Sequence, residues 1–471
     1  MNSSAREKAA KIVQRLQAAG FAAFWVGGCV RDFLLGREPQ DYDIATDARP
    51  EQIEKLFEKT IAVGRKFGVI VVVEGNQQFQ VATFRAEAEY QDGRRPEKVV
   101  FANAEADALR RDFTVNGLFY DPISKKIHDW VGGEKDLRAK IIRTIGKPEE
   151  RFAEDHLRLL RAVRFAAQMN FEIEPKTFSA IQSLAPKIKL ISAERIRDEL
   201  LKLFGPPKVE QASSRSQTEQ KKNGDRQDAR PTAACGLVLL RDSGLLEQIL
   251  PELAATISCD QSPDYHPEGS VFNHIKLMLE KLPANADELL PWTVLLHDIA
   301  KPVTAERDAQ TGAIHFYGHE KIGAEMARQI LNRLRFSKKL IDEIVACIRN
   351  HMQFKDVKQM RKATLRRLLL RETFPLELEL HRLDCLGSHG SLEHYDFLLE
   401  QAEELKKKPA IRPLLLTGDD LIRLGMKPGP AMGKLLHEIR EKQLADELKN
   451  KREAKAWAKR EIERRKAESG E

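Results

Sequence analysis

The segment FWVGGCVRDFLLGREPQDYDIAT, residues 24–46, runs from a short apolar strand through two adjacent glycines to a pair of aspartates. Glycines that follow a strand let backbone N–H groups approach phosphate oxygens closely, and the helical turn after them points its N-terminus at the same anion. Arg31, in that turn, can add a charge-assisted hydrogen bond. Gly27, Gly28 and Arg31 are therefore candidate phosphate-binding residues, although an ordinary tight turn uses the same residue types.

Residues 41–45, DYDIA, are predicted to form the next strand of the same sheet. Because side chains alternate along a strand, Asp41 and Asp43 would project from one face while Tyr42 and Ile44 face the core. Two adjacent carboxylates repel each other, and Mg²⁺ relieves this by binding them together with substrate phosphate oxygens. We therefore expect Asp41 and Asp43 to be catalytic residues that hold Mg²⁺ in a two-metal site. The alternative is an exposed turn with two solvated aspartates.

Residues 154–169 are predicted to form one helix, because apolar residues recur there at helical spacing. Asp155 and Arg158 are three residues apart, so they would be neighbours on one face of that helix. A carboxylate accepts hydrogen bonds and a guanidinium donates them, so together they can meet the Watson–Crick edge of a base. Arg161 and Arg164 continue the same ridge. The alternative is an ordinary helix pair that contributes ~0.3 kcal/mol.

Three motifs together resemble the signature of class II tRNA nucleotidyltransferases, the family of CCA-adding enzymes and bacterial poly(A) polymerases. They are residues 24–46, RRDFTVNGL at residues 110–118 and PEERFAEDHLRLLRAVRF at residues 148–165. The resemblance is strong over residues 1–205 and implies a polymerase-β-like head, with Asp155 and Arg158 acting as a protein template for the incoming nucleotide. The nucleotide-binding residues that it implies are Gly27, Gly28, Arg31, Arg111, Asp112, Asn116, Asp155, Arg158, Arg161 and Arg164.

Two positions depart from the family pattern. Gln80 lies in the strand before ATFR, where relatives often carry an acidic residue, so the resemblance does not supply a third metal-binding carboxylate. His156 occupies a position where proline is common and would suit the first turn of a helix. Both departures leave the paired aspartates and the predicted template residues intact.

Most of the twelve histidines lie between residues 266 and 390. His274 lies in a helical pattern, His297 and Asp298 are adjacent within LLHDIAKP, and Asp384 follows in HRLD. This order resembles the HD phosphohydrolase fold, and imidazole with carboxylate suits a metal that supports phosphoester hydrolysis. We therefore expect a second divalent metal at His274, His297, Asp298 and Asp384. His319 and His351 are further possible ligands.

The composition is typical of a folded protein with more than one domain. The chain has 471 residues, of which 42% are apolar and 32% charged, and it lacks a run of ~18 apolar residues that would predict a membrane span. The five cysteines show no paired spacing, which argues against a disulfide framework and favours the reducing cytoplasm. The net charge of +7 fits a polyanionic partner, but many unrelated proteins share it.

The expected fold class is α+β, with a small mixed sheet and helices in a nucleotidyltransferase head, followed by an all-α neck, an HD body and a tail. We place the catalytic head at residues 1–146, the base-recognising neck at 147–265, the HD-type domain at 266–400 and an RNA-contacting tail at 401–471. Within the neck, residues 209–233 are rich in Ser, Gln, Lys, Asp and Arg, and are predicted to be a disordered insert.

The simplest function that the resemblance implies is addition of C, C and A to the tRNA 3′ end from CTP and ATP. The domain order, with the transferase before the HD module, is that of CCA-adding enzymes that carry HD; stringent-response enzymes have the reverse order. Neither a membrane nor an obligate protein partner is expected. A poly(A) polymerase or an A-adding enzyme shares the motifs and stays open. An HD phosphohydrolase with an inactive, RNA-binding transferase domain is a third possibility, which the intact Asp41 and Asp43 disfavour.

Overall fold

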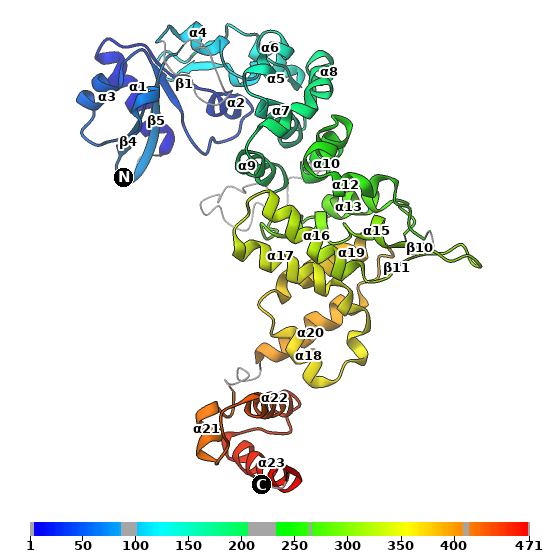
Figure 1. Cartoon of the computed structure of the whole chain (residues 1–471). Coiled ribbons are helices and arrows are strands. Elements are labelled where there is room, and N and C mark those ends of the chain that lie inside the picture. The colour runs from blue at the N-terminus through cyan, green and yellow to red at the C-terminus, as the bar shows by residue number, and fades with distance from the viewer. Residues whose placement is uncertain (1–3, 86–100, 206–231, 263–265, 408–413, 470–471) are drawn as a thin grey trace, which may run out of the picture. The chain divides into compact units, whose positions relative to one another are not determined.

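The computed structural model describes residues 4–85, 101–205, 232–262, 266–407 and 414–469 (Figure 1). The chain divides into two compact units. The first is Met1–Ala254 with Arg333–Arg335, and the second is Ala255–Asn332 with Phe336–Glu471. A mixed sheet with helices lies in the first unit and helices predominate in the second, which confirms the predicted α+β class.

A seven-stranded sheet forms the core of the first unit, in the order β3-β4-β5-β2-β1-β6-β7. Its strands are β1 (Ala23–Val26), β2 (Ile44–Thr46), β3 (Thr60–Gly64), β4 (Val69–Glu74), β5 (Gln77–Thr83), β6 (Phe119–Asp121) and β7 (Lys126–His128). Strands β2 and β5 pair in parallel and the other neighbours are antiparallel. Central strands are rich in β-branched and aromatic residues, and their side chains pack into an apolar cluster that includes Val26, Ala45, Phe84 and Phe119.

The predicted strand at residues 41–45 is shorter than expected, because β2 begins only at Ile44. Aspartate is disfavoured in strands, and both Asp41 and Asp43 lie before the first residue of β2. The backbone is nevertheless aligned with β1, since the N–H of Val26 donates to the carbonyl oxygen of Asp43 at 3.0 Å. Tyr42 and Ile44 are buried while Asp41 and Asp43 are exposed, so the predicted alternation holds.

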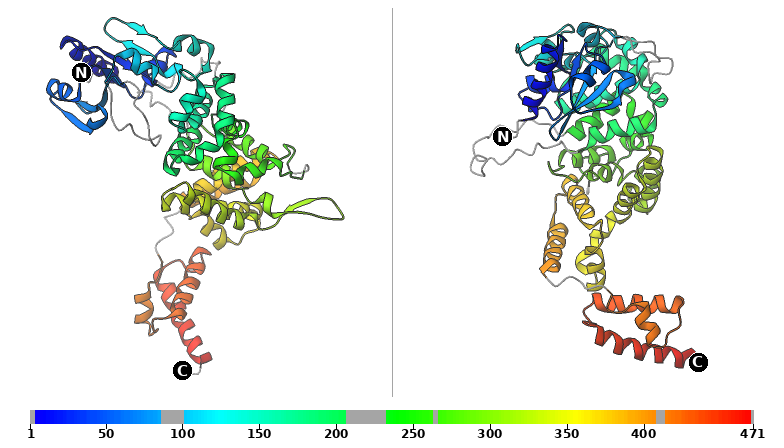
Figure 2. Two further views of the ribbon diagram at one scale, coloured as in Figure 1. Left: turned by 45° about the horizontal axis from the view of Figure 1, so that its top comes forward. Right: turned by 90° about the vertical axis from the view of Figure 1, so that its left-hand side faces the viewer.

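Helices surround the sheet and continue into the rest of the first unit (Figures 1 and 2). They are α1 (Ala5–Ala18), α2 (Gly28–Leu34), α3 (Pro50–Leu56), α4 (Ala104–Leu109), α5 (Gly133–Ala139), α6 (Pro148–Glu154), α7 (Leu157–Met169), α8 (Pro175–Leu184), α9 (Ala193–Phe204), α10 (Thr232–Asp242), α11 (Leu245–Ile249) and α12 (Pro251–Ala254). A short parallel pair, β8 (Ile141–Ile142) and β9 (Glu172–Ile173), lies beside α7. The buried face of α7 packs against α9 and α10.

The single helix predicted at residues 154–169 is wrong, because the chain breaks between α6 and α7. Asp155 has an extended backbone, with φ −151° and ψ 103°. Its Oδ1 accepts the backbone N–H of Leu157 at 3.1 Å, and thereby satisfies a donor that the start of α7 leaves free. Asp155 and Arg158 are therefore not neighbours along one continuous helix.

The disordered insert predicted at residues 209–233 lies almost wholly outside the described residues. Its last two residues were assigned wrongly, since Thr232 and Ala233 are the first residues of α10. They precede the apolar run ACGLVLL, and Ala233 is buried, so burial of apolar surface stabilises the helix from its first turn. Residues 86–100 are likewise outside the described part of the chain.

The described residues of the second unit form helices and one hairpin. The helices are α13 (Val271–Glu280), α14 (Leu290–Leu296), α15 (Lys301–Thr304), α16 (His319–Arg333), α17 (Lys338–Asn350), α18 (Lys362–Leu369), α19 (Phe374–Gly387), α20 (Glu393–Lys407), α21 (Gly418–Arg423), α22 (Pro430–Leu444) and α23 (Lys451–Ser469). The 3₁₀ helix η5 (His351–Gln359) follows α17 directly. Figure 2 shows the hairpin of β10 (Ala305–Arg307) and β11 (Ile314–Phe316) projecting from these helices.

The apolar segment around the His–Asp pair explains how the second unit holds polar side chains in its interior. Leu295, Leu296, Ile299 and Ala300 are completely buried. Since His297 and Asp298 lie between them, packing of the flanking residues fixes the pair inside the unit. In the part of the chain that the structure describes, no helix combines the length and apolar character needed to cross a bilayer.

Candidate functional site

Asp41 and Asp43 extend from the chain just before β2, and their side chains are exposed. Burial of the surrounding region raises the pKa of Asp43, while Arg111 opposes this shift and the nearby Asp41 carboxylate adds to it. The two carboxylates are thus close enough to repel each other. A divalent cation between them would relieve that repulsion, so the donor set fits a hard metal such as Mg²⁺.

The glycine turn lies beside Asp41 and Asp43, because Arg111 is close to Asp43 and also contacts Gly27. Gly27 has φ +73°, in the left-handed region that favours glycine, and caps α2, which begins at Gly28. A Cβ atom at Gly27 would lie 3.0 Å from Nη1 of Arg111, so a larger residue would displace this guanidinium. Asp107, which is buried, holds Arg111 by an ion pair of 2.9 Å. Arg111 is therefore oriented before any phosphate binds.

A chain of hydrogen bonds joins four other predicted nucleotide-binding residues. Nη1 of Arg31 donates to Oδ1 of Asn116 at 2.7 Å, and Nδ2 of Asn116 donates to Oδ1 of Asp112 at 3.1 Å. Nη2 of Arg161 donates to the other oxygen of Asp112 at 2.7 Å. Burial raises the pKa of Asp112, but Arg161 outweighs this and lowers it overall. The structure therefore brings residues 31, 112, 116 and 161 together, as the motifs predict.

Phe165 is a residue of this site that the sequence analysis did not single out. The guanidinium carbons of Arg31, Arg161 and Arg164 lie 5.4, 5.1 and 4.0 Å from the centre of its ring. Each contact is a cation–π interaction that restrains an arginine without neutralising its charge. The only signal in the sequence is the aromatic residue directly after Arg164, which helical spacing alone assigns to packing.

The predicted template residues, Asp155 and Arg158, each have another partner. Oδ2 of Asp155 lies 2.6 Å from Nη2 of Arg195, on α9. Arg158 pairs with Glu154 and donates to the carbonyl oxygen of Arg151 at 2.8 Å. Arg195 is forty residues from Asp155, and no periodicity connects the two, so sequence reasoning missed this contact.

Arg164, the remaining predicted nucleotide-binding residue, is buried and forms an ion pair with Glu199 on α9. Glu199 also lies 3.6 Å from Nη1 of Arg161. Burial raises the pKa of Glu199, but Arg164 and then Arg161 outweigh it and lower the pKa overall. Glu199 of α9 therefore holds Arg161 and Arg164 of α7 in place.

The position of a possible third carboxylate is occupied by an amide. In the parallel pairing of β2 and β5, Ile44 is opposite Val81. Gln80 precedes Val81 as Asp43 precedes Ile44, so Gln80 is the neighbour of Asp43 across the two strands. Its side chain is exposed, on the strand next to the predicted metal site.

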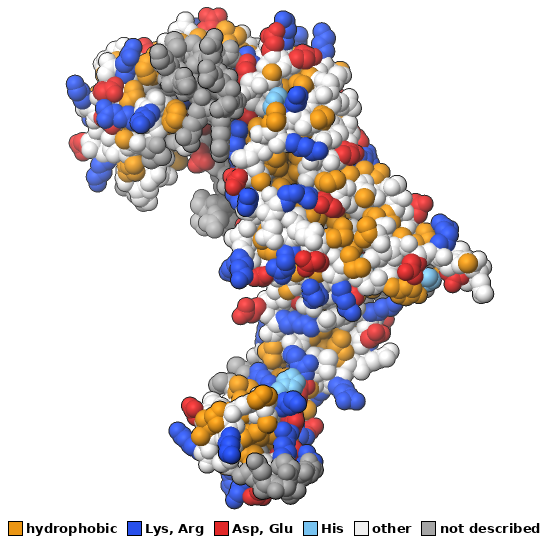
Figure 3. Space-filling model, in the orientation of Figure 1, with side chains coloured by type: hydrophobic (Ala, Val, Ile, Leu, Met, Phe, Trp, Pro, Cys, Tyr) orange, Lys and Arg blue, Asp and Glu red, His pale blue; other side chains and the backbone are white. Residues whose placement is uncertain are grey.

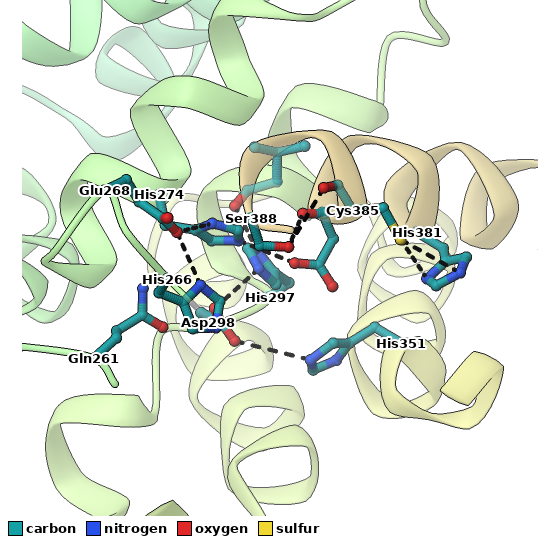
Figure 4. A network of polar contacts seen from close by, with 12 residues as sticks. Gln261, His266, Glu268, His274, His297, Asp298, His351, His381, Cys385 and Ser388 are labelled. Atoms are coloured by element: carbon teal, nitrogen blue, oxygen red, sulfur yellow. Dashed lines mark hydrogen bonds and ion pairs between the residues drawn. The ribbon is translucent and has the colours of Figure 1, made fainter. Parts of the chain in front are cut away.

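A second candidate site lies inside the second unit, where histidine and aspartate side chains meet (Figure 4). His274 lies on α13 and is 0% exposed, and Asp298, which follows α14, is 2% exposed. His319 and His351 are the first residues of α16 and η5, and Asp384 lies on α19. These predicted ligands converge, together with His297, although they come from segments more than a hundred residues apart.

The four histidines of this cluster share one arrangement. The Nδ1 atom of each faces a protein acceptor: Glu268 Oε1 for His274 at 2.8 Å, and the carbonyl oxygens of Val294 for His297 at 2.9 Å, Phe316 for His319 at 2.7 Å and Ile348 for His351 at 2.6 Å. A contact at Nδ1 fixes the orientation of the ring and directs Nε2 into the cluster. The Nε2 atoms of His274 and His297 are buried and face carboxylates, that of Asp384 at 3.0 Å and that of Asp298 at 3.1 Å. This is the arrangement expected of metal ligands.

The possible ligands fall into two groups of three. His274, His297 and Asp384 form one group, and Asp298, His319 and His351 form the other, with ligand atoms in each group within 4.8 Å of one another. In the first group, Nε2 of His274 lies 3.0 Å from Oδ1 of Asp384. Asp298 faces both groups, since Oδ2 is 3.1 Å from Nε2 of His297 and Oδ1 is 3.4 Å from Nε2 of His319.

Charged groups of both signs lie in the cluster: burial lowers the pKa of His274, but the contacts with Asp384 and Glu268 outweigh it and raise the pKa to about 9. Burial raises the pKa of Asp298, but His297 and Lys301 outweigh it and hold the pKa well below its usual value. Burial also raises the pKa of Asp384, and the contact with His274 lowers it overall. Both carboxylates are therefore ionised. Burial and the neighbouring His297 lower the pKa of His351 to about 4, so its ring is neutral and free to bind a metal.

Three residues around the cluster were not predicted. Glu268 orients His274, as described above, and also lies 2.8 Å from Nδ1 of His266. The Nζ atom of Lys301 lies 2.7 Å from Oδ2 of Asp298 and donates to Oε1 of Gln261 at 2.6 Å. The sequence signal for Lys301 is a lysine three residues after Asp298 in a helical segment. Gln261 and Glu268 have no comparable helical spacing to a predicted ligand.

Three family models match this chain. The model of the poly(A) polymerase head domain matches residues 23–143. A model of an RNA- and SrmB-binding site of polymerase A matches residues 170–213, and one of domain 2 of tRNA nucleotidyltransferases matches residues 314–457. The matched regions include the paired aspartates and part of the histidine cluster.

Similar curated proteins are described as CCA-adding enzymes. That of Lactobacillus helveticus is 46% identical over 206 residues, which are 44% of this chain and 51% of the relative. That of Staphylococcus aureus strain MRSA252 is 44% identical over 213 residues, which are 45% of this chain and 53% of the relative. The match therefore spans about half the length of these relatives.

Solved structures resemble nearly the whole chain. The Bacillus stearothermophilus CCA-adding enzyme in complex with CTP superposes with a TM-score of 0.70 and 26% identity, over 99% of this chain and 100% of that one. The Thermotoga maritima CCA-adding enzyme complexed with tRNA shares the fold, with a TM-score of 0.57 and 16% identity over 98% of this chain and 96% of that one.

Proposed function

We propose that this chain, which belongs to the family of class II tRNA nucleotidyltransferases and poly(A) polymerases, adds C, C and A to the 3′ end of tRNA without a nucleic-acid template. The observation that carries the proposal is the exposed pair of Asp41 and Asp43 next to Arg111 and the glycine turn. This pair is the metal-binding element that nucleotidyl transfer requires. The substrates are CTP and ATP, and the RNA partner is tRNA.

The reaction forms one P–O bond and breaks another. The 3′-hydroxyl oxygen of tRNA attacks the α-phosphorus of the nucleotide and releases its proton to solvent, the α–β phosphoanhydride bond breaks, and pyrophosphate leaves with that electron pair. Mg²⁺, when bound by Asp41 and Asp43, would lower the pKa of the attacking hydroxyl and stabilise the charge on pyrophosphate. Gly28 and Arg111 would bind and orient the triphosphate with their N–H groups. The N–H of Gly27 donates to the carbonyl oxygen of Leu118 at 3.2 Å, so Gly27 would contribute by letting the phosphates approach the turn closely.

The arginine network supports phosphate binding and base selection. Asn116 and Asp112 hold Arg31 and Arg161 by the hydrogen bonds described above, so these cations are positioned before the nucleotide arrives. When the nucleotide binds, Asp155 would release Arg195 and Arg158 would release Glu154. The carboxylate of Asp155 would then accept hydrogen bonds from the base edge, and the guanidinium of Arg158 would donate to it. The exchange replaces one set of charge-assisted hydrogen bonds with another.

Contacts with tRNA beyond its 3′ end would be made by shape and phosphate charge. Figure 3 shows lysine and arginine side chains spread over the face in view, interspersed with acidic ones. We also propose the domain limits stated in the sequence analysis, and a cytoplasmic location. None of the five cysteines forms a disulfide, which suits a reducing compartment.

Incubation with three RNAs tests the proposal. Transcripts of one tRNA ending before CCA or after CC, and an unrelated RNA of equal length, are each given CTP, ATP or both, and products are resolved at single-nucleotide spacing. We expect three additions to the first tRNA with both nucleotides, one ATP-dependent addition to the second and none to the unrelated RNA. Long A tails on every RNA would identify a poly(A) polymerase instead, and addition to the CC end alone would identify an A-adding enzyme.

A second function is favoured by the buried histidine cluster. We propose that it holds two divalent cations, one at each group of three ligands with Asp298 between them, and that it hydrolyses phosphoesters. The observation that carries this is the convergence of four Nε2 atoms whose rings are fixed through Nδ1. The cations would polarise the phosphoester and lower the pKa of an attacking water. Lys301 holds Asp298, and Glu268 holds His274.

A further inference from the structure

We infer that Gly387, the last residue of α19, is a positioning residue for one of the two proposed metal sites, that of His274, His297 and Asp384. The inference rests on the proposed hydrolytic function of the cluster. It concerns a residue with no side chain and therefore no ligand atom, which acts by letting α19 approach α13 closely. The other metal site, at Asp298, His319 and His351, does not depend on this approach.

The contacts of Gly387 show that the space for a side chain is already filled. A Cβ atom at this position would lie 2.9 Å from Cγ of Met278, 3.2 Å from Cε1 of His274 and 3.4 Å from Nδ1 of the same ring. Met278 and His274 are themselves completely buried, so neither can move into solvent. The φ angle of Gly387 is not in the left-handed region, so the backbone conformation does not itself require glycine. The close approach of the two helices does.

An added methyl would displace Met278, whose Cγ is nearest, and would press on the imidazole of His274. Cε1 lies between the two ring nitrogens, so pressure on it shifts both the contact with Glu268, at 2.8 Å, and that with Asp384, at 3.0 Å. Asp384 lies on the same helix as Gly387, three residues earlier, so the helix that carries one ligand would push the other away. Misplacement of a metal ligand or of the group that orients it weakens metal binding by roughly 10–100-fold.

Gly323, on α16, provides a matched control. A Cβ there would lie 3.5 Å from the carbonyl oxygen of His297, 3.6 Å from Cβ of Ala300 and 3.7 Å from Cγ2 of Ile348. These are ordinary van der Waals distances, so Gly323→Ala adds the same methyl beside the same cluster without displacing a ligand. Both glycines lie within helices, where alanine is intrinsically favoured over glycine.

Calorimetric titration of the full-length protein with Ni²⁺ tests the inference, because Ni²⁺ prefers imidazole to the carboxylate pair of the head. We expect two binding events in the unaltered protein, and one of them about tenfold weaker or more in Gly387→Ala. Gly323→Ala should keep both within about twofold. Without metal, Gly323→Ala should melt like the unaltered protein, and Gly387→Ala should melt at a lower temperature but still cooperatively, because the added methyl overpacks the core. Equal Ni²⁺ affinities in Gly387→Ala and the unaltered protein would overturn the inference and leave the hydrolytic site standing. Absence of Ni²⁺ binding in the unaltered protein would overturn both.

A double variant separates positioning from loss of fold. Met278→Ala removes the nearest atom, so Gly387→Ala with Met278→Ala should recover part of the Ni²⁺ affinity lost in Gly387→Ala alone. Nucleotide addition by the head is measured on each variant as a check of folding elsewhere. If Gly387→Ala melts without cooperativity and the double variant recovers neither folding nor affinity, the glycine is merely structural and the inference is wrong.

Discussion

The proposed nucleotide site of the first unit and the histidine cluster of the second differ in the group that would complete them. Asp41 and Asp43 are exposed and repel each other, and the arginines nearby are held by Asp107, Asp112 and Glu199. A charged substrate would complete such a site by binding to these groups. In the cluster, by contrast, the ligands are buried and each ring is fixed in advance. On the proposed function, a cation would occupy it before any substrate arrives.

The largest effect is expected at the exposed pair. Asp41→Ala should reduce incorporation of both CTP and ATP by roughly a thousandfold or more, because a bound metal contributes several kcal/mol to the transition state. Asp47→Ala, which alters another exposed aspartate just after β2, is the control and should change little. Single-turnover assays with tRNA lacking CCA measure both. Substantial activity in Asp41→Ala would remove the metal assignment from the first unit.

A double substitution in the cluster tests whether the two sites are independent. His297→Ala with Asp298→Ala should end metal-dependent hydrolysis of simple phosphomonoesters and cyclic phosphodiesters, and leave CCA addition within about twofold, because no residue of the head would lose a contact. His315→Ala, at an exposed position of β11, is the matched control. Loss of nucleotide addition in the double variant would show that the two functions are coupled.

Substitution of the residues proposed to read the base should have a smaller effect, and one confined to the choice of nucleotide. Asp155→Ala should lower the preference for CTP and ATP over UTP and GTP by about tenfold, as loss of one base-reading contact implies, with little change in tRNA affinity. Arg195→Ala should shift the same preference less, because it frees Asp155 without removing it. Asp198→Ala, on the exposed face of α9, serves as the control. Unchanged selectivity in Asp155→Ala would contradict the template role.

The smallest effect is expected at Phe165. Phe165→Leu removes the ring that three guanidinium groups face and should raise the KM for CTP by about threefold to tenfold, since each cation–π contact contributes ~0.5–1 kcal/mol. Phe165→Tyr keeps the ring and should behave like the unaltered protein. Steady-state kinetics at saturating tRNA distinguish the two variants. Equal KM values for leucine and phenylalanine at this position would exclude a cation–π role.

The sequence predicted the first site largely through local rules. Alternation of side chains predicted that Asp41 and Asp43 lie on one face. This holds although β2 begins only at Ile44, because Asp43 already accepts a backbone hydrogen bond from Val26 of β1. The helix prediction failed at Asp155 for a local reason as well, since its side chain caps the following helix. Helical periodicity does not detect a break that one side chain makes.

The missed residues act across the chain. Arg195 and Glu199 reach α7 only because α9 packs against it, and no spacing rule relates residues so far apart. In the second unit, the ligand types and their order were visible, but Glu268 and Gly387 were not. A glycine that permits close approach of two helices leaves no mark in hydropathy or charge, and only its distances to neighbouring side chains in the folded protein indicate it.

A complex with a nucleotide and Mn²⁺, examined by anomalous diffraction, tests the central claim most directly. We predict an anomalous peak within direct bonding distance of carboxylate oxygens from both Asp41 and Asp43, with the α-phosphate of the nucleotide as a further ligand. The pair would then share a cation next to the guanidinium of Arg111. A fully bound triphosphate with no peak at the pair, or with the two carboxylates turned apart, would contradict the assignment of this chain as a nucleotidyltransferase.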